Sequence, residues 1–156
     1  MIFFDLDDTI LDHSYAQTTA SGVFFDHFAA CLPYSREQFQ RVWPEILEKH
    51  FQRFARGEIT FPQVRQARIR EVFGDPAISD DEADARFSVY LRQYEANWRL
   101  FDDVLPCLER LNGRRVGVIT NGSHRMQHQK LEQTGLAGRF STVVISEEVK
   151  IGRAHV

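Results

Sequence analysis

The sequence has little of several features that mark common classes of protein. It has two cysteines, Cys31 and Cys107, too far apart for a CxxC pair, so neither a zinc site nor a redox motif is indicated. We expect both to be buried as small hydrophobic residues. No apolar run approaches bilayer length, and the N-terminus lacks the basic region of a signal peptide. The net charge of −3 gives no basic excess for binding nucleic acid. These absences predict a cytoplasmic protein with neither a membrane nor a nucleic-acid partner.

Core-forming residues, in contrast, are plentiful. The 156 residues are 43% hydrophobic and 26% charged, and 13 of them are phenylalanine. This balance is that of an ordinary globular protein. The length suits one domain, or a small core that carries an inserted subdomain.

The first stretch with chemical content lies at the N-terminus. Ile2-Phe3-Phe4 is a short apolar run typical of a strand buried on both faces, and the acidic stretch Asp5-Leu6-Asp7-Asp8-Thr9 follows it. The two-residue period of a strand places Asp5 and Asp7 on the same side. Carboxylates that close repel, and one must be protonated unless a cation lies between them. Mg²⁺ prefers such oxygen ligands, so we predict a metal-assisted phosphoryl-transfer site at Asp5 and Asp7.

The same acidic stretch has a purely structural interpretation. Acidic and hydroxyl residues after a strand often cap the next helix, and Asp7-Asp8-Thr9 is suited to that role. The local pattern alone does not separate capping from catalysis, because short motifs have many chance matches.

The middle of the chain, residues 14–98, shows helical periodicity and no strand signal. We expect helices over 14–32, over 35–57 with a kink or break at Trp43-Pro44, over 60–73 and over 79–98. The arginines between Arg65 and Arg70 are expected to cover a solvent-facing surface.

Beyond residue 98 the pattern changes to alternating helices and strands. It predicts a helix over 104–111, a strand over 116–120, a helix ending near 135 and a strand over 142–146. Helices between strands at this spacing give parallel strands. The predicted fold is therefore α/β, with an incomplete Rossmann-like parallel sheet from 1–13 and 99–149. An all-helical insertion over 14–98 should cover the C-terminal edge of that sheet.

A second polar stretch follows the predicted strand 116–120. Thr120 can hydrogen-bond a phosphate oxygen, Gly122 allows close backbone approach, and the start of the next helix favours an anion. Thr120, Asn121 and Gly122 are therefore candidate phosphate-binding residues. The alternative is an ordinary helix N-cap, which Asn121 or Ser123 could provide.

Together these stretches resemble the haloacid dehalogenase superfamily. Asp5-Leu6-Asp7-Asp8-Thr9 looks like its first motif, Val118-Ile119-Thr120-Asn121-Gly122 like its second, and Ile145-Ser146-Glu147-Glu148 like the approach to its third. The helical insertion is similar to the superfamily's cap of the first type.

The resemblance implies a Mg²⁺-dependent phosphatase acting on a small phosphorylated metabolite, such as a nucleotide or sugar phosphate. Asp5 would attack phosphorus and form an aspartyl-phosphate, and Asp7 would serve as general acid and then base. The Asp5 side chain and the Asp7 carbonyl would hold Mg²⁺, and Thr120 would bind the phosphoryl group. Asp7 favours phosphate-ester chemistry over dehalogenation, because a halide leaves unprotonated.

Two other functions stay open. A phosphomutase of the same superfamily would shield the aspartyl-phosphate from water. A non-catalytic phospho-acceptor module, such as a response-regulator receiver, also gathers acids around Mg²⁺, but a large insertion after its first strand does not suit it.

The C-terminal residues depart from the superfamily pattern. A lysine is expected after the third strand and an acidic pair after a fourth, yet the nearest basic residues are Lys150 and Arg153, and no acidic pair follows. One back-translation of residues 151–156 resembles a widely used sequencing adapter read in frame. We therefore expect residues 150–156 to be a non-native tail on an incomplete fragment.

One histidine pair has metal-ligand spacing. His124 and His128 are four residues apart, but no glutamate stands beside them as in HExxH, so we expect a solvated helix face.

Overall fold

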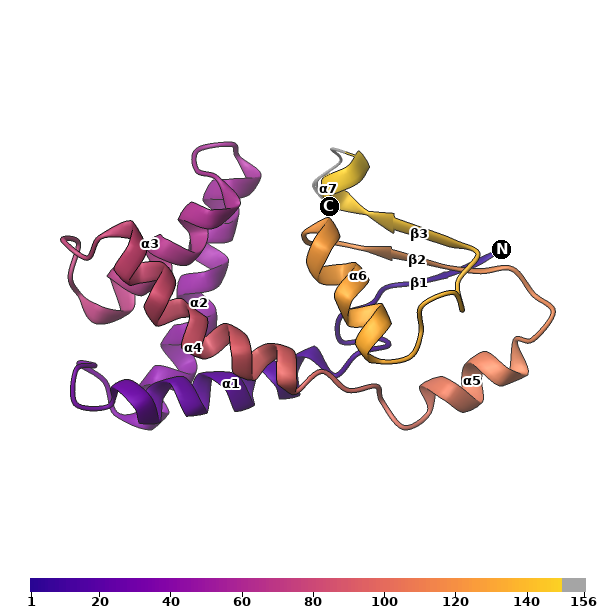
Figure 1. Ribbon diagram of the computed structural model, residues 1–156, viewed down its shortest axis with the longest axis horizontal. Helices are drawn as coiled ribbons and strands as arrows, with labels where there is room; N and C mark the ends of the chain where they lie inside the picture. The colour runs from indigo at the N-terminus through magenta and orange to yellow at the C-terminus, as the bar shows by residue number, and fades with distance from the viewer. Residues whose placement is uncertain (150–156) are drawn as a thin grey trace. The chain divides into compact units, whose positions relative to one another are not determined.

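The computed structural model describes residues 1–149, and these fall into two compact units (Figure 1). One unit joins Met1–Ala16 to the part of the chain from Trp98 onward, and the other is Gln17–Asn97. The sequence-based boundaries for the insertion were 14 and 98. The predictions about residues 150–156, including Lys150 and Arg153, lie outside the described residues.

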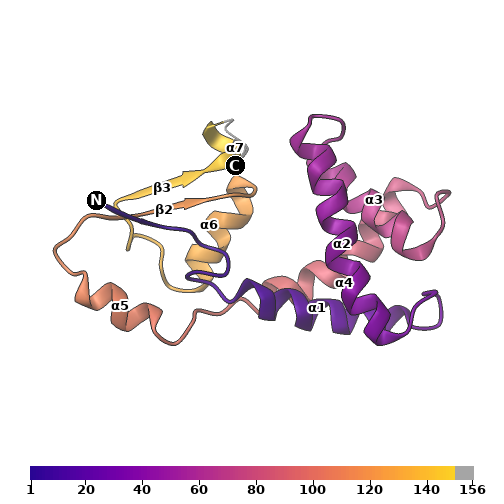
Figure 2. The same ribbon diagram turned by 180° about the vertical axis from the view of Figure 1, so that it is seen from behind.

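The first unit is built on a parallel sheet, which Figures 1 and 2 show from opposite sides. In the described part of the chain its strands are β1 (Ile2–Phe4), β2 (Val116–Thr120) and β3 (Thr142–Ile145), in the order β1-β2-β3. The helices of this unit are α5 (Val104–Arg110), α6 (His124–Gln133) and the short α7 (Ser146–Val149). The predicted α/β class and parallel pairing are confirmed.

One face of this sheet packs on helices, and the opposite face is largely exposed. Val116 and Val118 share a buried cluster with Val104 of α5 and Leu131 of α6. On the other face, Phe3 and Ile119 keep 44% and 51% of their surface exposed. The prediction that β1 is buried on both faces is wrong, because the described part of the chain leaves the face to which Phe3 points largely exposed.

Phe3 nevertheless has a defined partner. Its ring lies over Gly117 of the neighbouring strand, where an added Cβ would stand 2.6 Å from Cε1 of Phe3. A larger residue at position 117 would therefore force the exposed Phe3 ring to move away from this position.

The second unit is all helical, as predicted. It contains most of α1 (His13–Phe28), whose first residues belong to the first unit, and all of α2 (Arg36–Ala55), α3 (Phe61–Phe73) and α4 (Asp80–Ala96). Its core is aromatic: Phe24, Phe39, Trp43 and Tyr90 form a chain of ring contacts with centroids 4.8–5.9 Å apart.

Helices α1 and α2 differ from prediction. Helix α1 ends at Phe28 rather than Leu32, and Cys31 closes a turn by donating its N–H to the Phe28 carbonyl. Helix α2 runs unbroken through Pro44, because proline removes only one backbone hydrogen bond while the buried Trp43 and Ile46 hold the helix in place.

Further burial predictions are wrong. Neither cysteine is buried: Cys31 is exposed, because it lies beyond the end of α1, and Cys107 is half-exposed. Arg68 faces the core instead of solvent: it is 1% exposed, and its guanidinium lies 3.6 Å from the centroid of the Trp43 ring. Nη2 of Arg68 also donates to the Trp43 carbonyl at 3.0 Å. Burial lowers the pKa of Arg68 to about 10, and stacking on an aromatic face is the arrangement that lets arginine tolerate such a site.

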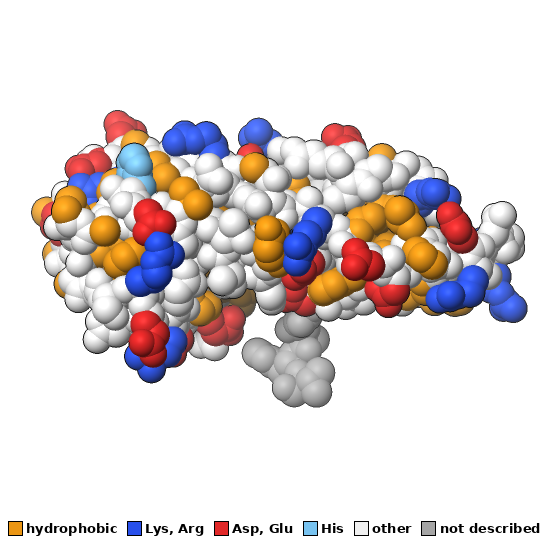
Figure 3. All heavy atoms as spheres, turned by 90° about the horizontal axis from the view of Figure 1, so that it is seen from below, with side chains coloured by type: hydrophobic (Ala, Val, Ile, Leu, Met, Phe, Trp, Pro, Cys, Tyr) orange, Lys and Arg blue, Asp and Glu red, His pale blue; other side chains and the backbone are white. Residues whose placement is uncertain are grey.

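Charges on the surface are mixed. On the face displayed in Figure 3, acidic and basic side chains lie beside one another. Among the described helices, none has the length and apolar character required to cross a membrane.

Candidate active site

The candidate site begins where β1 ends. Asp5 follows the strand directly, and the next side chain, Leu6, is fully buried in the core. Because neighbouring side chains point in opposite directions, the burial of Leu6 leaves Asp5 and Asp7 half-buried on the other side. The chain then turns tightly, with Asp8 at φ 55° and the N–H groups of Ile10 and Leu11 both donating to the Leu6 carbonyl. The turn fixes the acidic stretch at the C-terminal edge of the sheet.

The aspartates that cap helix α1 are Asp8 and Asp12, not Asp5 or Asp7. The Asp8 carboxylate accepts from the backbone N–H and the hydroxyl of Ser14, at 2.7 and 2.9 Å. Asp12 accepts from the N–H of Tyr15 at 3.1 Å and forms an ion pair with Arg99, whose hydrogen bond lowers the pKa of Asp12. The start of α1 is thus capped by Asp8 and Asp12, and the capping interpretation applies to them.

Asp7 is paired with a lysine from α6. Nζ of Lys130 lies 2.7 and 2.9 Å from the two carboxylate oxygens of Asp7, and Nδ1 of His13 lies 3.9 Å from one of them. Lys130 is only 2% exposed. Burial lowers the pKa of the Lys130 ammonium, while the negative charges of Asp7, Asp8 and Asp5 oppose that change.

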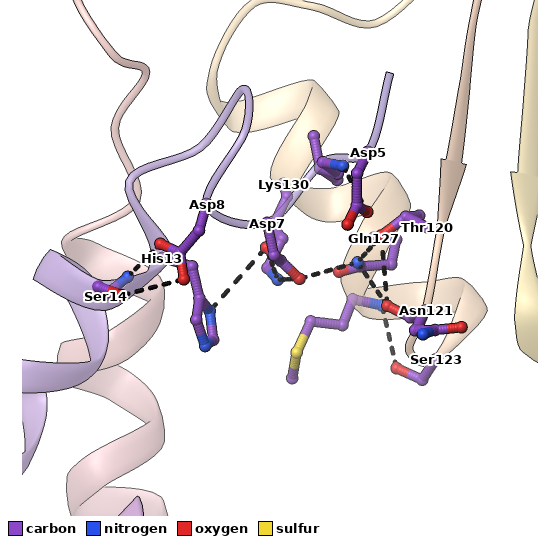
Figure 4. Close-up of polar contacts among 12 residues, drawn as sticks. Asp5, Asp7, Asp8, His13, Ser14, Thr120, Asn121, Ser123, Gln127 and Lys130 are labelled. Atoms are coloured by element: carbon purple, nitrogen blue, oxygen red, sulfur yellow. Dashed lines mark hydrogen bonds and ion pairs between the residues drawn. The ribbon is translucent and has the colours of Figure 1, made fainter. Parts of the chain in front are cut away.

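A buried amide joins the two sequence motifs (Figure 4). Nε2 of Gln127, also on α6, donates to Asp7 at 3.1 Å, to the Thr120 hydroxyl at 2.7 Å and to the Asn121 carbonyl at 2.8 Å. The Asp7 carboxylate and the Asn121 carbonyl can only accept hydrogen bonds, so the NH₂ end of the Gln127 amide must face them. Since an NH₂ group has two hydrogens, the three acceptors share them. Gln127 therefore links the end of β1 to the end of β2.

The Thr120 stretch lies at the end of β2. Thr120 is buried, and its hydroxyl makes only a long bond, 3.3 Å, to the Asn121 carbonyl while it accepts from Gln127. Gly122 has φ 132°, which favours glycine, and its N–H donates to Ser146 Oγ at 3.2 Å.

Of the two predicted alternatives, Ser123 is the residue that caps α6, through the N–H of Met126. The first N–H of α6, from His124, donates to the Glu147 carboxylate at 2.6 Å. The helix start thus holds an anion supplied by the chain itself, as its dipole favours.

The structure brings Asp7, Thr120 and Asn121 into one hydrogen-bonded group with two residues that the sequence reasoning missed, Gln127 and Lys130. The sequence does contain a signal for Gln127 and Lys130. Positions 127, 130 and 131 share one face of α6, and Leu131 marks that face as the one packed on the sheet. Polar residues on a buried face require partners, and the acidic stretch supplies one.

The oxygen donors at this edge are of the type that suits Mg²⁺. The Asp7 side chain is engaged by Lys130, which leaves the Asp5 carboxylate and the Asp7 backbone carbonyl as the donors that would hold the ion. One oxygen of Asp5 also accepts from the N–H of Leu6 at 2.8 Å, which orients the carboxylate. Mg²⁺ commonly takes one or two protein oxygens and completes its shell with water and phosphate, so this donor set fits.

A comparison with known families decides the assignment. The sequence profile of the haloacid dehalogenase-like hydrolases matches residues 1–155. The chain belongs to this family. The HAD-hydrolase YfnB of Bacillus subtilis (strain 168) is 24% identical over 148 residues, covering 94% of this chain and 61% of YfnB. Its crystal structure, described as bound to magnesium, superposes with a TM-score of 0.72 over 96% of this chain and 64% of that one.

Two other relatives are similar along nearly the whole chain. The pyrimidine 5'-nucleotidase YjjG of Escherichia coli (strain K12) is 25% identical, over 99% of this chain and 65% of its own length. The glyceraldehyde 3-phosphate phosphatase of Methanothermobacter thermautotrophicus is 28% identical, over 99% of this chain and 66% of its own length. The chain thus spans a little under two thirds of the length of these relatives.

Proposed function

We propose that this chain is part of a Mg²⁺-dependent phosphatase that hydrolyses a small phosphorylated metabolite through an aspartyl-phosphate on Asp5. The observation that carries the proposal is the hydrogen-bonded link Asp7–Gln127–Thr120, which ties the ends of two parallel strands together beside Asp5. A nucleophile, a proton-transfer group and a phosphate-binding hydroxyl at one sheet edge are the parts that phosphoryl transfer requires.

Asp5 would act as the nucleophile. Its carboxylate directly follows β1 and is oriented by the N–H of Leu6. Bound Mg²⁺ would neutralise charge on the phosphoryl oxygens, as metal ions do in such transfers. Thr120 would donate to a phosphoryl oxygen. Its present bond to the Asn121 carbonyl is long, so the hydroxyl can turn toward a stronger acceptor at small cost.

Asp7 would move the protons. In the second step, when water attacks the aspartyl-phosphate, the Asp7 carboxylate, which Lys130 holds in place, would accept a proton from that water. In the first step Asp7 must deliver a proton to the leaving oxygen. Before that step the Asp7 carboxylate therefore has to bind a proton, and one of its hydrogen bonds from Lys130 has to break.

The relatives support the substrate class. Two of them are named for the dephosphorylation of small molecules, a pyrimidine nucleotide and glyceraldehyde 3-phosphate. The magnesium in the YfnB structure supports the metal. We therefore extend to this chain a small phosphate monoester as substrate.

The test is hydrolysis of p-nitrophenyl phosphate in the presence of Mg²⁺, measured for this chain and for the complete product of its parent gene. The Asp5→Asn variant should lose activity, and EDTA should abolish it. Asp8→Asn is the matched control, because it removes a neighbouring carboxylate that caps α1 and should keep turnover. Undiminished turnover in Asp5→Asn would refute the proposal.

A further inference from the structure

Three side chains with metal-binding atoms meet on α6 and α7. His124 and His128 are one helical turn apart on α6, and their ring centroids lie 4.4 Å from each other. Glu148, on α7, forms an ion pair with Nδ1 of His124. One ligand atom from each of the three lies within 4.8 Å of the others.

The ion pair accounts for the approach of His124 to Glu148, but it does not involve His128, whose ring packs against that of His124. A metal cation bound by the two imidazoles and the carboxylate would engage all three side chains at once.

The chemical types of the ligand atoms indicate which metal would bind. Imidazole nitrogen suits zinc and its neighbours in the transition series, whereas Mg²⁺ prefers oxygen. Zinc bonds of about 2.0–2.1 Å in a tetrahedron place ligand atoms about 3.4 Å apart. The three ligand atoms are within 4.8 Å already, and His124 and Glu148 are exposed while His128 is half-exposed. Rotation of these side chains can bring the three ligand atoms to the spacing that zinc requires without moving the backbone.

We propose that His124, His128 and Glu148 form a binding site for a divalent transition metal of the zinc type, separate from the Asp5–Asp7 oxygens. Three protein ligands leave a fourth position for water. Bound metal would clamp α6 to α7, where bonds from Gly122 to Ser146 and from His124 to Glu147 already join the two segments.

The test is calorimetric titration of Zn²⁺ into the metal-free chain, with millimolar Mg²⁺ present so that oxygen sites are already filled. We expect one Zn²⁺ per chain. His128→Asn and Glu148→Gln should each weaken binding by about tenfold or more, since each removes one ligand. The matched control is His27→Asn, which removes an exposed histidine from α1 and should bind Zn²⁺ as the wild type does. Unchanged affinity in both ligand variants, or no binding by the wild type, would overturn the proposal.

A second measurement needs no variant. Co²⁺ in a site with two imidazoles and a carboxylate should show the intense visible absorption of four-coordinate cobalt, and Zn²⁺ should displace it. A weak spectrum of six-coordinate cobalt would count against the site.

Discussion

Lys130 places its ammonium nitrogen 2.7 and 2.9 Å from the two carboxylate oxygens of Asp7, 123 residues earlier in the chain. From the sequence, we expect Mg²⁺ to balance the charge of the acidic stretch, with a lysine from beyond the third strand. The structure provides a protein cation as well. Lys130 neutralises Asp7, so the Asp5 carboxylate and the Asp7 backbone carbonyl are the groups left for an ion.

The first prediction concerns this pair. Lys130→Met keeps most of the side-chain volume but removes the charge, which leaves the Asp7 carboxylate without its main partner. Because the Asp7 side chain is 27% exposed, water compensates in part, and we expect the free energy of unfolding to fall by about 1–3 kcal/mol. Urea denaturation measures the change.

The control for this prediction is a double-mutant cycle. In Asp7→Asn/Lys130→Met the isolated carboxylate is gone, so the double variant should be more stable than the sum of the single losses predicts. Strict additivity would mean that the two residues do not interact.

The second prediction concerns Gly122. An alanine there would have φ near 132° and a Cβ 3.2 Å from Cδ of Gln127, the residue that joins Asp7 to Thr120. We expect Gly122→Ala to cost about 1–3 kcal/mol of stability from backbone strain and to reduce the proposed phosphatase activity of the complete protein by displacing Gln127.

Gly135→Ala separates the effect of backbone strain from the effect of crowding Gln127. Gly135 also has positive φ, 72°, but nothing lies within 4 Å of its added Cβ. This variant should lose stability through strain alone and keep its activity. Equal activity in the two alanine variants would show that crowding of Gln127 has no consequence for the site.

The parts of the site that the sequence predicts are those fixed by local rules. Asp5 and Thr120 follow apolar runs, and parallel strands bring the carboxyl ends of such runs to one edge. The acidic stretch, the parallel sheet and the helical insertion follow from periodicity and turn residues alone.

The missed features depend on contacts between distant residues. Lys130 and Arg68 are long charged side chains, which usually face water, and burying each requires a specific partner elsewhere in the chain. For Lys130 the partner is Asp7, and for Arg68 it is the ring and carbonyl of Trp43. Periodicity does not reveal such partners.

The third prediction uses Arg68. Arg68→Met replaces a buried cation with an apolar chain of similar length, and we expect stability within about 1 kcal/mol of the wild type, because desolvation of the charge offsets its contacts. Arg68→Ala leaves a cavity beside Trp43 and should cost about 2–4 kcal/mol. Thermal denaturation followed by circular dichroism compares the two. A methionine variant as unstable as the alanine variant would show that the charge itself, rather than the volume, holds this core together.

The last prediction concerns pH and His50 of α2, which is 5% exposed. Nε2 of His50 lies 2.8 Å from the Glu71 carboxylate, and Nδ1 lies 3.3 Å from the guanidinium of Arg53. A guanidinium only donates, so Nδ1 must accept and the imidazole is neutral with its proton on Nε2. Burial lowers the pKa of His50 below 6.5, although Glu71 acts in the opposite direction.

A histidine whose pKa is lower in the folded state binds its proton first in the unfolded chain. The stability that it contributes is therefore present above pH 6.5 and is lost as the pH falls through the folded-state pKa. We expect the free energy of unfolding to decrease between pH 7 and 5, by at most about 1.4 kcal/mol per pH unit for this one proton. In His50→Gln the decrease should be smaller, whereas His27→Gln, which changes an exposed histidine, should keep the wild-type slope. Equal slopes in wild type and His50→Gln would show that His50 does not stay neutral in the folded protein.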